Sequence, residues 1–172
     1  MPTTFKIKKD VNGMWVPDHP NLDICAHADD GTDREELRKN LFIPIEEKYP
    51  GEYTLEYDLE DLRGEVLSKI DIRSDALLEG FQYEGITFSL SPKAQIRYEY
   101  MDRKADGLTY PLYINSLDDR DMLELQDAEQ TREFCHASVM HVLGVVGSGT
   151  VQKAFVRDIE TIEGLLAYED PR

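Results

Sequence analysis

Cysteine is scarce in this chain, which has only Cys25 and Cys135 among 172 residues and no C-x-x-C pair. Two thiols cannot build the disulfide framework of a small secreted domain, although they could form a single bridge. Cys135 falls in a helical pattern, which favours a small buried side chain. We therefore expect a protein that is made in a reducing cytoplasm.

Long hydrophobic runs and basic residues are also few. No stretch approaches the roughly 20 apolar residues that cross a bilayer, and the polar start, residues 1–10, is unlike a signal peptide. The chain has 19 Lys and Arg against 35 Asp and Glu, a formal net charge of −16. Phosphate backbones and anionic membranes repel such a chain. The composition therefore predicts no nucleic-acid and no membrane partner, and leaves open a solvated acidic exterior or a basic protein partner.

The familiar catalytic motifs are missing as well. There is no G-x-S-x-G elbow, and the glycine-rich segment 144–150 lacks the lysine of a phosphate-binding loop. We interpret that segment as a turn between two helices, in which Ser148 or Thr150 caps the second helix. Adjacent carboxylates such as Asp118 and Asp119 carry little information in so acidic a chain. The sequence predicts no enzyme, no catalytic residues and no cofactor-binding residues.

Two groups of side chains are candidates for a metal site. The first combines thiols and imidazoles, which zinc prefers: Cys25, His27, Cys135 and His136. The second lies in the acidic loop of residues 18–33: Asp23, Asp29, Asp30 and Asp33. His136 and His141 are five residues apart, whereas zinc pairs on helices usually lie three or four apart, and the loop lacks the ordered spacing of a calcium motif. We expect structural or solvated roles for these residues, and no metal site.

Apolar periodicity predicts helices and short strands along the whole chain. Alternation predicts a hairpin of strands at residues 3–9 and 14–16 around the Asn12-Gly13 turn, a strand at 53–57, and hairpins within 81–90 and 110–125. Helical spacing predicts helices over residues 33–43, 59–78, 92–103, 128–143, 151–159 and 162–166.

Several residues are expected to begin, end or bury these helices. Thr32 is the predicted cap of the first helix, Pro44 is expected to stop or kink that helix, and Gly80 stops the second helix. In the helix that starts at Ser91, Ile96, Tyr100 and Met101 are predicted to be buried. The other predicted caps are Asp127 and Thr161, and the predicted buried face of the long helix is Phe134, Ala137, Val142 and Val145.

Together these elements predict an α+β fold: short antiparallel hairpins packed with several helices, and a helical C-terminal part. The predicted division is a small acidic N-terminal α+β region at residues 1–57 and a helix-rich α+β domain at residues 58–172.

The second of these regions resembles a known family. Between residues 80 and 97 a hairpin of the form G-x-x-Y-x-G-x-x-F precedes a helix that begins with Ser and carries Ala-Gln in its first turns. The matching residues are Gly80, Tyr83, Gly85, Phe88, Ser91, Ala94 and Gln95. A second hairpin, a long helix, a further helix and a T-x-E-x-L turn follow. In this order, residues 58–172 resemble a small domain of unknown function found in phage tail and tail-fibre assembly proteins.

The resemblance implies a role in a phage particle or its assembly, and it implies no catalytic residues. We therefore expect a structural component of a bacteriophage virion, in the tail, neck or fibre region, made in the host cytoplasm. Its partners would be other phage structural proteins, with several copies forming a homo-oligomer in the particle. The expected contact surface is the apolar C-terminal helices. The alternatives are a transient tail-fibre assembly chaperone or adaptor, and a small metal-dependent hydrolase.

Overall fold

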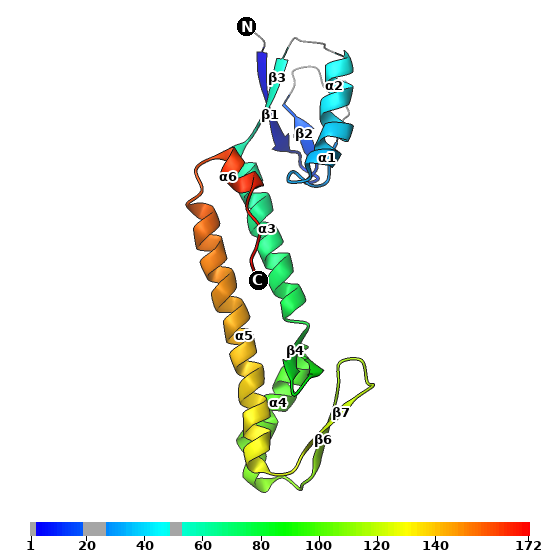
Figure 1. The fold of residues 1–172 in the computed structure, drawn as a ribbon, viewed down its shortest axis with the longest axis vertical. Coiled ribbons are helices and arrows are strands. Elements are labelled where there is room, and N and C mark those ends of the chain that lie inside the picture. Colours follow the sequence, from blue (N-terminus) through cyan, green and yellow to red (C-terminus); the bar gives the residue numbers. More distant parts are fainter. Residues whose placement is uncertain (1–2, 19–26, 49–52) are drawn as a thin grey trace. The chain divides into compact units, whose positions relative to one another are not determined.

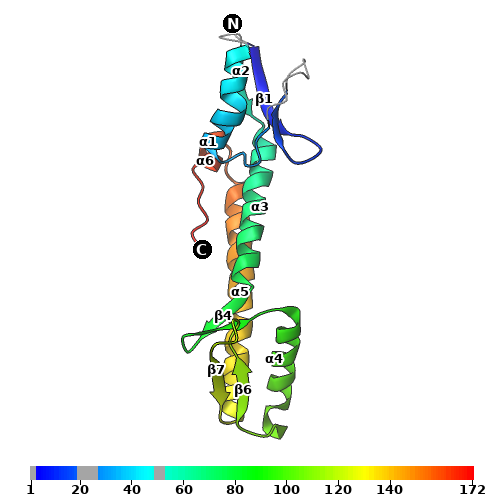
Figure 2. The ribbon, with the colours of Figure 1, turned by 90° about the vertical axis from the view of Figure 1, so that its right-hand side faces the viewer.

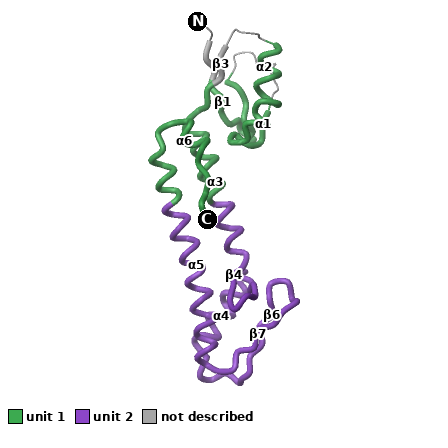
Figure 3. The backbone as a smooth tube through the Cα atoms, in the orientation of Figure 1, with its two compact units in different colours: residues 1–70, 152–172 green, residues 71–151 purple. Residues whose placement is uncertain are grey.

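The computed structural model describes residues 3–18, 27–48 and 53–172, and the chain divides into two compact units (Figure 3). Unit 1 comprises Met1–Ile70 and Gln152–Arg172, and unit 2 comprises Asp71–Val151. Both changes of unit fall inside helices, whereas the sequence predicted one boundary after residue 57. The predicted α+β class is confirmed, because in these described ranges helices alternate with three small, mostly antiparallel sheets.

Unit 1 contains a three-stranded sheet of order β2-β1-β3 (Figure 1). β1 (Thr3–Lys9) pairs antiparallel with β2 (Trp15–Pro17) and parallel with β3 (Tyr53–Tyr57). The predicted hairpin and the third strand are thus confirmed. Gly13 has a φ of 80°, a left-handed conformation that suits glycine in the Asn-Gly turn. The hairpin places the fully buried Trp15 in the core of this unit.

The helix that follows begins at another cap than predicted, and it does not stop at Pro44. It consists of α1 (Arg34–Leu37), the π-helical turn η1 (Arg38–Phe42) and α2 (Ile43–Lys48). Asp33 caps it instead of Thr32, because its carboxylate accepts the first free backbone N–H groups. The helix also continues through Pro44. The π-helical turn that ends at Phe42 contains Asn40, the residue whose carbonyl the ring of Pro44 would clash with in a regular α-helix.

The core of unit 1 joins segments from both ends of the chain. Leu37 and Leu41 are buried on one helix face, as predicted, and pack with α3 (Leu59–Leu77). Val156 and Leu165 complete the same cluster. Leu165 lies in α6 (Ile162–Leu166), which begins at the predicted cap, since the Thr161 hydroxyl accepts from the backbone N–H of Gly164. The last residues therefore belong to the N-terminal unit.

In unit 2, two hairpins and α4 (Pro92–Lys104) lie alongside the first part of α5 (Ala128–Arg157) (Figure 2). The hairpins confirm the prediction: β4 (Gly80–Tyr83) with β5 (Ile86–Ser89), and β6 (Leu112–Asn115) with β7 (Met122–Leu125). A one-turn 3-10 helix, η2 (Ala105–Gly107), follows α4. Gly80 begins β4 rather than capping α3. A Cβ atom there would lie 2.7 Å from the Phe88 carbonyl oxygen, so the close strand pairing needs glycine.

α4 starts where the sequence places it but buries another face. The Ser91 hydroxyl accepts from the backbone N–H of Ala94, as expected for the cap. The prediction that Ile96 and Tyr100 are buried is wrong: 68% and 58% of their surfaces are exposed. Met101 packs into the core, as predicted, and Tyr98 packs there in place of Ile96 and Tyr100. Both faces of this helix carry large apolar side chains, so periodicity alone could not select the buried one.

α5 runs unbroken over 30 residues, so the predicted turn at residues 144–150 is wrong. Its start is as predicted, because the Asp127 carboxylate accepts from the backbone N–H of Gln130 at 2.9 Å. Each glycine costs a helix only about 1 kcal/mol relative to alanine, which tertiary packing can offset. Ser148 and Thr150 donate their hydroxyls to the carbonyls of Val145 and Val146, at 3.0 and 2.9 Å, and cap nothing.

Candidate functional site

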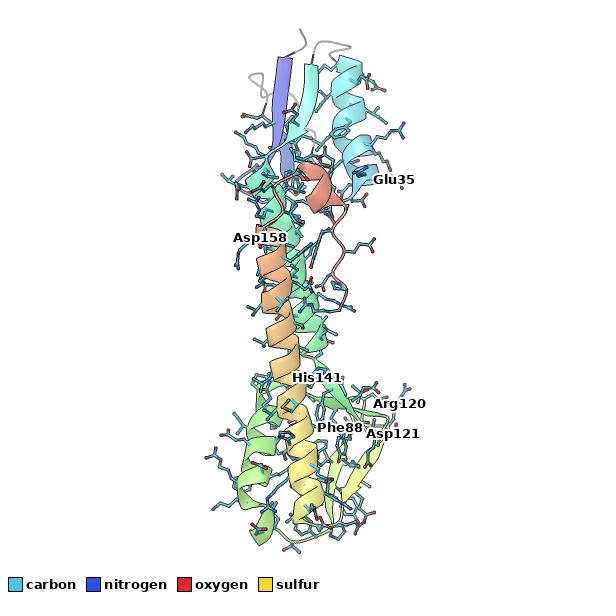
Figure 4. All side chains as sticks on the ribbon, turned by 60° about the vertical axis from the view of Figure 1, so that its left-hand side comes forward. Glu35, Phe88, Arg120, Asp121, His141 and Asp158 are labelled. Carbon is cyan, nitrogen blue, oxygen red and sulfur yellow. The ribbon has the colours of Figure 1, made fainter. Side chains whose placement is uncertain are left out.

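An aromatic cluster holds the elements of unit 2 together. Phe134 of α5 lies at its centre, with ring centroids at 5.0–5.4 Å from four other aromatic rings: Phe81, Tyr83, Phe88 and Tyr98. Figure 4 shows Phe88 beside α5, which it meets edge-on at Phe134. The Tyr98 contact fixes α4 against α5. Their mutual packing sets the geometry of the surface between them.

That surface is a groove of about 840 Å³ between α4 and α5. Its walls are mainly apolar, with Ile96 from α4 and Val139 and Leu143 from α5. Two carboxylates, Glu99 and Asp102, line it as well, and none of its lining residues is Lys or Arg. The groove is thus an apolar recess with charge of one sign.

The exposed side of α5 extends this apolar surface. Residues 137–151 contain no Asp, Glu, Lys or Arg. Large apolar side chains in this stretch are more than half exposed: Val139, Met140, Leu143, Val146 and Val151. By length and composition α5 could also cross a membrane, and only 28% of its most apolar window is buried. An uncovered apolar face of this kind is typical of a contact surface.

The predicted zinc candidates do not form a site in the part of the chain that is described. Cys25 lies outside it. Cys135 is buried, and its thiol donates to the Tyr98 carbonyl at 3.3 Å. On α5, His136 is exposed at the groove, whereas His141 lies 3.0 Å from the Leu77 carbonyl oxygen. Among the described residues, no three His, Cys, Asp or Glu side chains are placed to hold a metal ion.

The acidic loop serves local structure where it is described; Asp23 lies outside the described residues. One oxygen of Asp30 accepts from Thr32, and the other lies 2.5 Å from Lys69 Nζ. Burial raises the pKa of Asp30, but the hydrogen bonds from Lys69 and Thr32 outweigh it and hold this pKa below its ordinary value. Asp33 caps α1, and the backbone N–H of Asp29 donates to Glu36. The carboxylates of Asp30, Asp33 and Glu36 are thus occupied by the loop and its neighbours.

Because Cys135 is buried, its thiol is expected to react slowly with alkylating reagents. Burial first, and the charge of Asp102 second, raise its pKa to about 11. In a Cys25→Ser variant, alkylation by iodoacetamide at about pH 8 should be at least about tenfold slower in the folded than in the urea-unfolded chain. Because the pKa rises on folding, the protonated thiol stabilises the fold below its ordinary pKa of about 8.5. This contribution should be lost as the pH rises through about 11. Equal alkylation rates in both states would contradict a buried thiol.

The groove was missed by sequence reasoning, although two signals for it exist. One is the uncharged stretch at residues 137–151, and the other is the second apolar face of α4 at Ile96 and Tyr100. No protein-family model matches the chain. No solved structure matches it either. The surface of unit 2 is therefore the main physical basis for a function.

Proposed function

We propose that this protein is a structural component of a bacteriophage virion, in the tail, neck or fibre region, and that it works through protein–protein contacts. The observation that carries the proposal is the uncovered apolar surface of α4 and α5. Apolar side chains that are left exposed in a row favour burial against another protein. The resemblance of residues 58–172 to a phage tail-associated domain supplies the setting.

Contacts of this kind suit a particle with several copies of each part. Symmetry repeats one modest interface many times, so each contact can be small while the assembly is stable. The net charge of −16 keeps free copies apart in solution. Copies would then come together on other phage structural proteins rather than on each other alone.

Mass spectrometry of purified particles tests the proposal. The protein should be present in a fixed ratio to a known tail protein, and it should stay after a high-salt wash that removes adsorbed cytoplasmic proteins. A nonstructural phage protein is the control for carry-over. Absence from particles, combined with copurification with a fibre from infected cells, would replace the structural role by that of a transient assembly adaptor.

A further inference from the structure

We infer that the groove between α4 and α5 binds one amphipathic helix of a partner protein, a helix with Lys or Arg beside its apolar face. The inference deepens the proposed function, since it rests on a role in protein contacts and names the chemistry of the contact.

The shape of the groove suits a helix. Two packed helices form its walls, and the apolar ridge of a third helix fits such a groove. α4 has 13 residues and is therefore about 20 Å long, enough to pair with three to four helical turns. The apolar side chains on the walls have exposed surface that a partner can bury: Ile96 is 68% exposed, Val139 54% and Leu143 60%.

The charge of the groove selects a basic partner. Glu99 and Asp102 line the groove on the α4 side, one turn of helix apart, and no lysine or arginine lines it. Glu99 is already paired with Arg103, at 2.5 Å, but this pair is solvent-exposed and weak. A partner helix with Lys or Arg along its edge would face two carboxylates. One with Glu in those places would face like charge.

The same charges disfavour two other occupants. A second copy of the chain would bring a further net charge of −16 to an acidic groove. An anionic membrane would repel the acidic groove and the acidic chain as a whole. Membrane insertion of α5 would also pull Phe134, which is fully buried, out of the aromatic cluster. A basic helix from another protein meets none of these costs.

The test uses the full chain and designed peptides of about 18 residues, long enough to span the groove. One fluorescein-labelled peptide has Leu at i, i+3, i+4 and i+7 with flanking Lys, a second has Glu in place of Lys, and a third has the Leu positions scrambled. Fluorescence anisotropy at about 0.15 M salt limits screening-sensitive surface attraction. The Lys peptide should bind at least about tenfold more tightly than the other two.

Matched variants locate the binding. Ile96→Glu should lower the affinity for the Lys peptide at least about tenfold. Ile72→Glu is the control, because Ile72 is an equally exposed isoleucine of the same unit, at 65%. It should leave the affinity unchanged. The double variant Glu99→Lys with Asp102→Lys should reverse the preference and favour the Glu peptide. Circular dichroism checks that each variant is folded.

Four outcomes would overturn the inference. The first is equal binding of the Lys peptide by wild type and Ile96→Glu, and the second is equal affinity of the wild type for the Lys and Glu peptides. The third is self-association in sedimentation equilibrium that Ile96→Glu abolishes, which would make a second copy the occupant. The fourth is flotation with phosphatidylcholine vesicles that Ile96→Glu abolishes, which would make a lipid surface the occupant.

These outcomes differ from failure of the proposed function. Loss of peptide binding, with the protein still present in particles, removes only the groove assignment. Peptide binding with absence from particles leaves the groove intact and removes the virion role.

Discussion

Phe134→Ala is expected to lower the free energy of unfolding by about 3–5 kcal/mol, the range for truncating a fully buried aromatic side chain. Phe134 has no exposed surface, and its ring contacts aromatic side chains from β4, β5 and α4. Removing the ring leaves a cavity where three elements meet and loses edge-to-face contacts with Phe88 and Tyr98, each worth about 0.5–1.5 kcal/mol beyond area burial. The neighbouring side chains cannot collapse into the space without moving a whole hairpin.

Urea unfolding followed by far-ultraviolet circular dichroism measures this loss. Phe155→Ala is the matched control, because Phe155 lies in the same helix and is 59% exposed. It should cost less than about 1 kcal/mol, since little buried area is lost. Similar losses for the two variants would contradict the central position of Phe134. Because Phe134 also fixes α4 against α5, Phe134→Ala should lower the affinity of the groove for the Lys peptide.

Gly31→Ala is expected to destabilise unit 1 by about 1–3 kcal/mol, the usual cost of overpacking a core. A Cβ atom at Gly31 would lie 2.2 Å from Cε2 of Trp15, far inside contact distance. Contacts on Trp15 restrict movement of the indole ring away from this position. The Trp15 backbone donates a hydrogen bond to the Ala28 carbonyl at 2.8 Å and accepts one from the Ala28 N–H at 3.1 Å. The ring packs edge-on against Tyr57, with ring centroids 5.9 Å apart. The smallest possible addition at this position therefore displaces the largest side chain of the core.

The same substitution at Gly64 should have the opposite sign. Gly64 lies within α3 with open space around its would-be Cβ atom, so Gly64→Ala should stabilise by about 0.5–1 kcal/mol through helix propensity. Fluorescence of the single tryptophan, Trp15, follows unit 1 directly. In a Trp15→Phe background, Gly31→Ala should lower the free energy of unfolding much less than it does in the wild type. Circular dichroism measures unfolding there, because that background has no tryptophan. A neutral Gly31→Ala in the wild-type background would show that the ring has room to move.

The parts of the fold that the sequence predicted correctly depend on neighbouring residues. Neighbouring residues alone determine the turn at Glu84 and Gly85, whose φ angles are 49° and 79°. The same is true of the helix start at Ser91-Pro92. The cap at Asp33 was placed one residue early because Thr32 is also a capping type, and only the folded loop, in which Thr32 bonds to Asp30, decides between them.

The errors arise where tertiary contacts decide. The glycines of α5 look like a break, yet the helix runs through them. On α4, Ile96 and Tyr98 are both suitable for a core, and the position of Phe134 selects Tyr98. The groove could not be predicted for the same reason, because Ile96 and Val139 come from different helices. Their proximity follows only from the packing of the aromatic cluster between those helices.

The discontinuity of unit 1 has a consequence for synthesis. Residues 71–151 form a unit that is contiguous in the chain, so a ribosome delivers all of it before Val156 and Leu165, which complete the core of unit 1, are made. Domains generally fold as units while the chain emerges. The middle of this protein can therefore mature first, while its N-terminal strands and helices wait with an incomplete core for the last segment to arrive. The speed at which residues 152–172 are translated would then govern how long that apolar surface is exposed to other nascent chains.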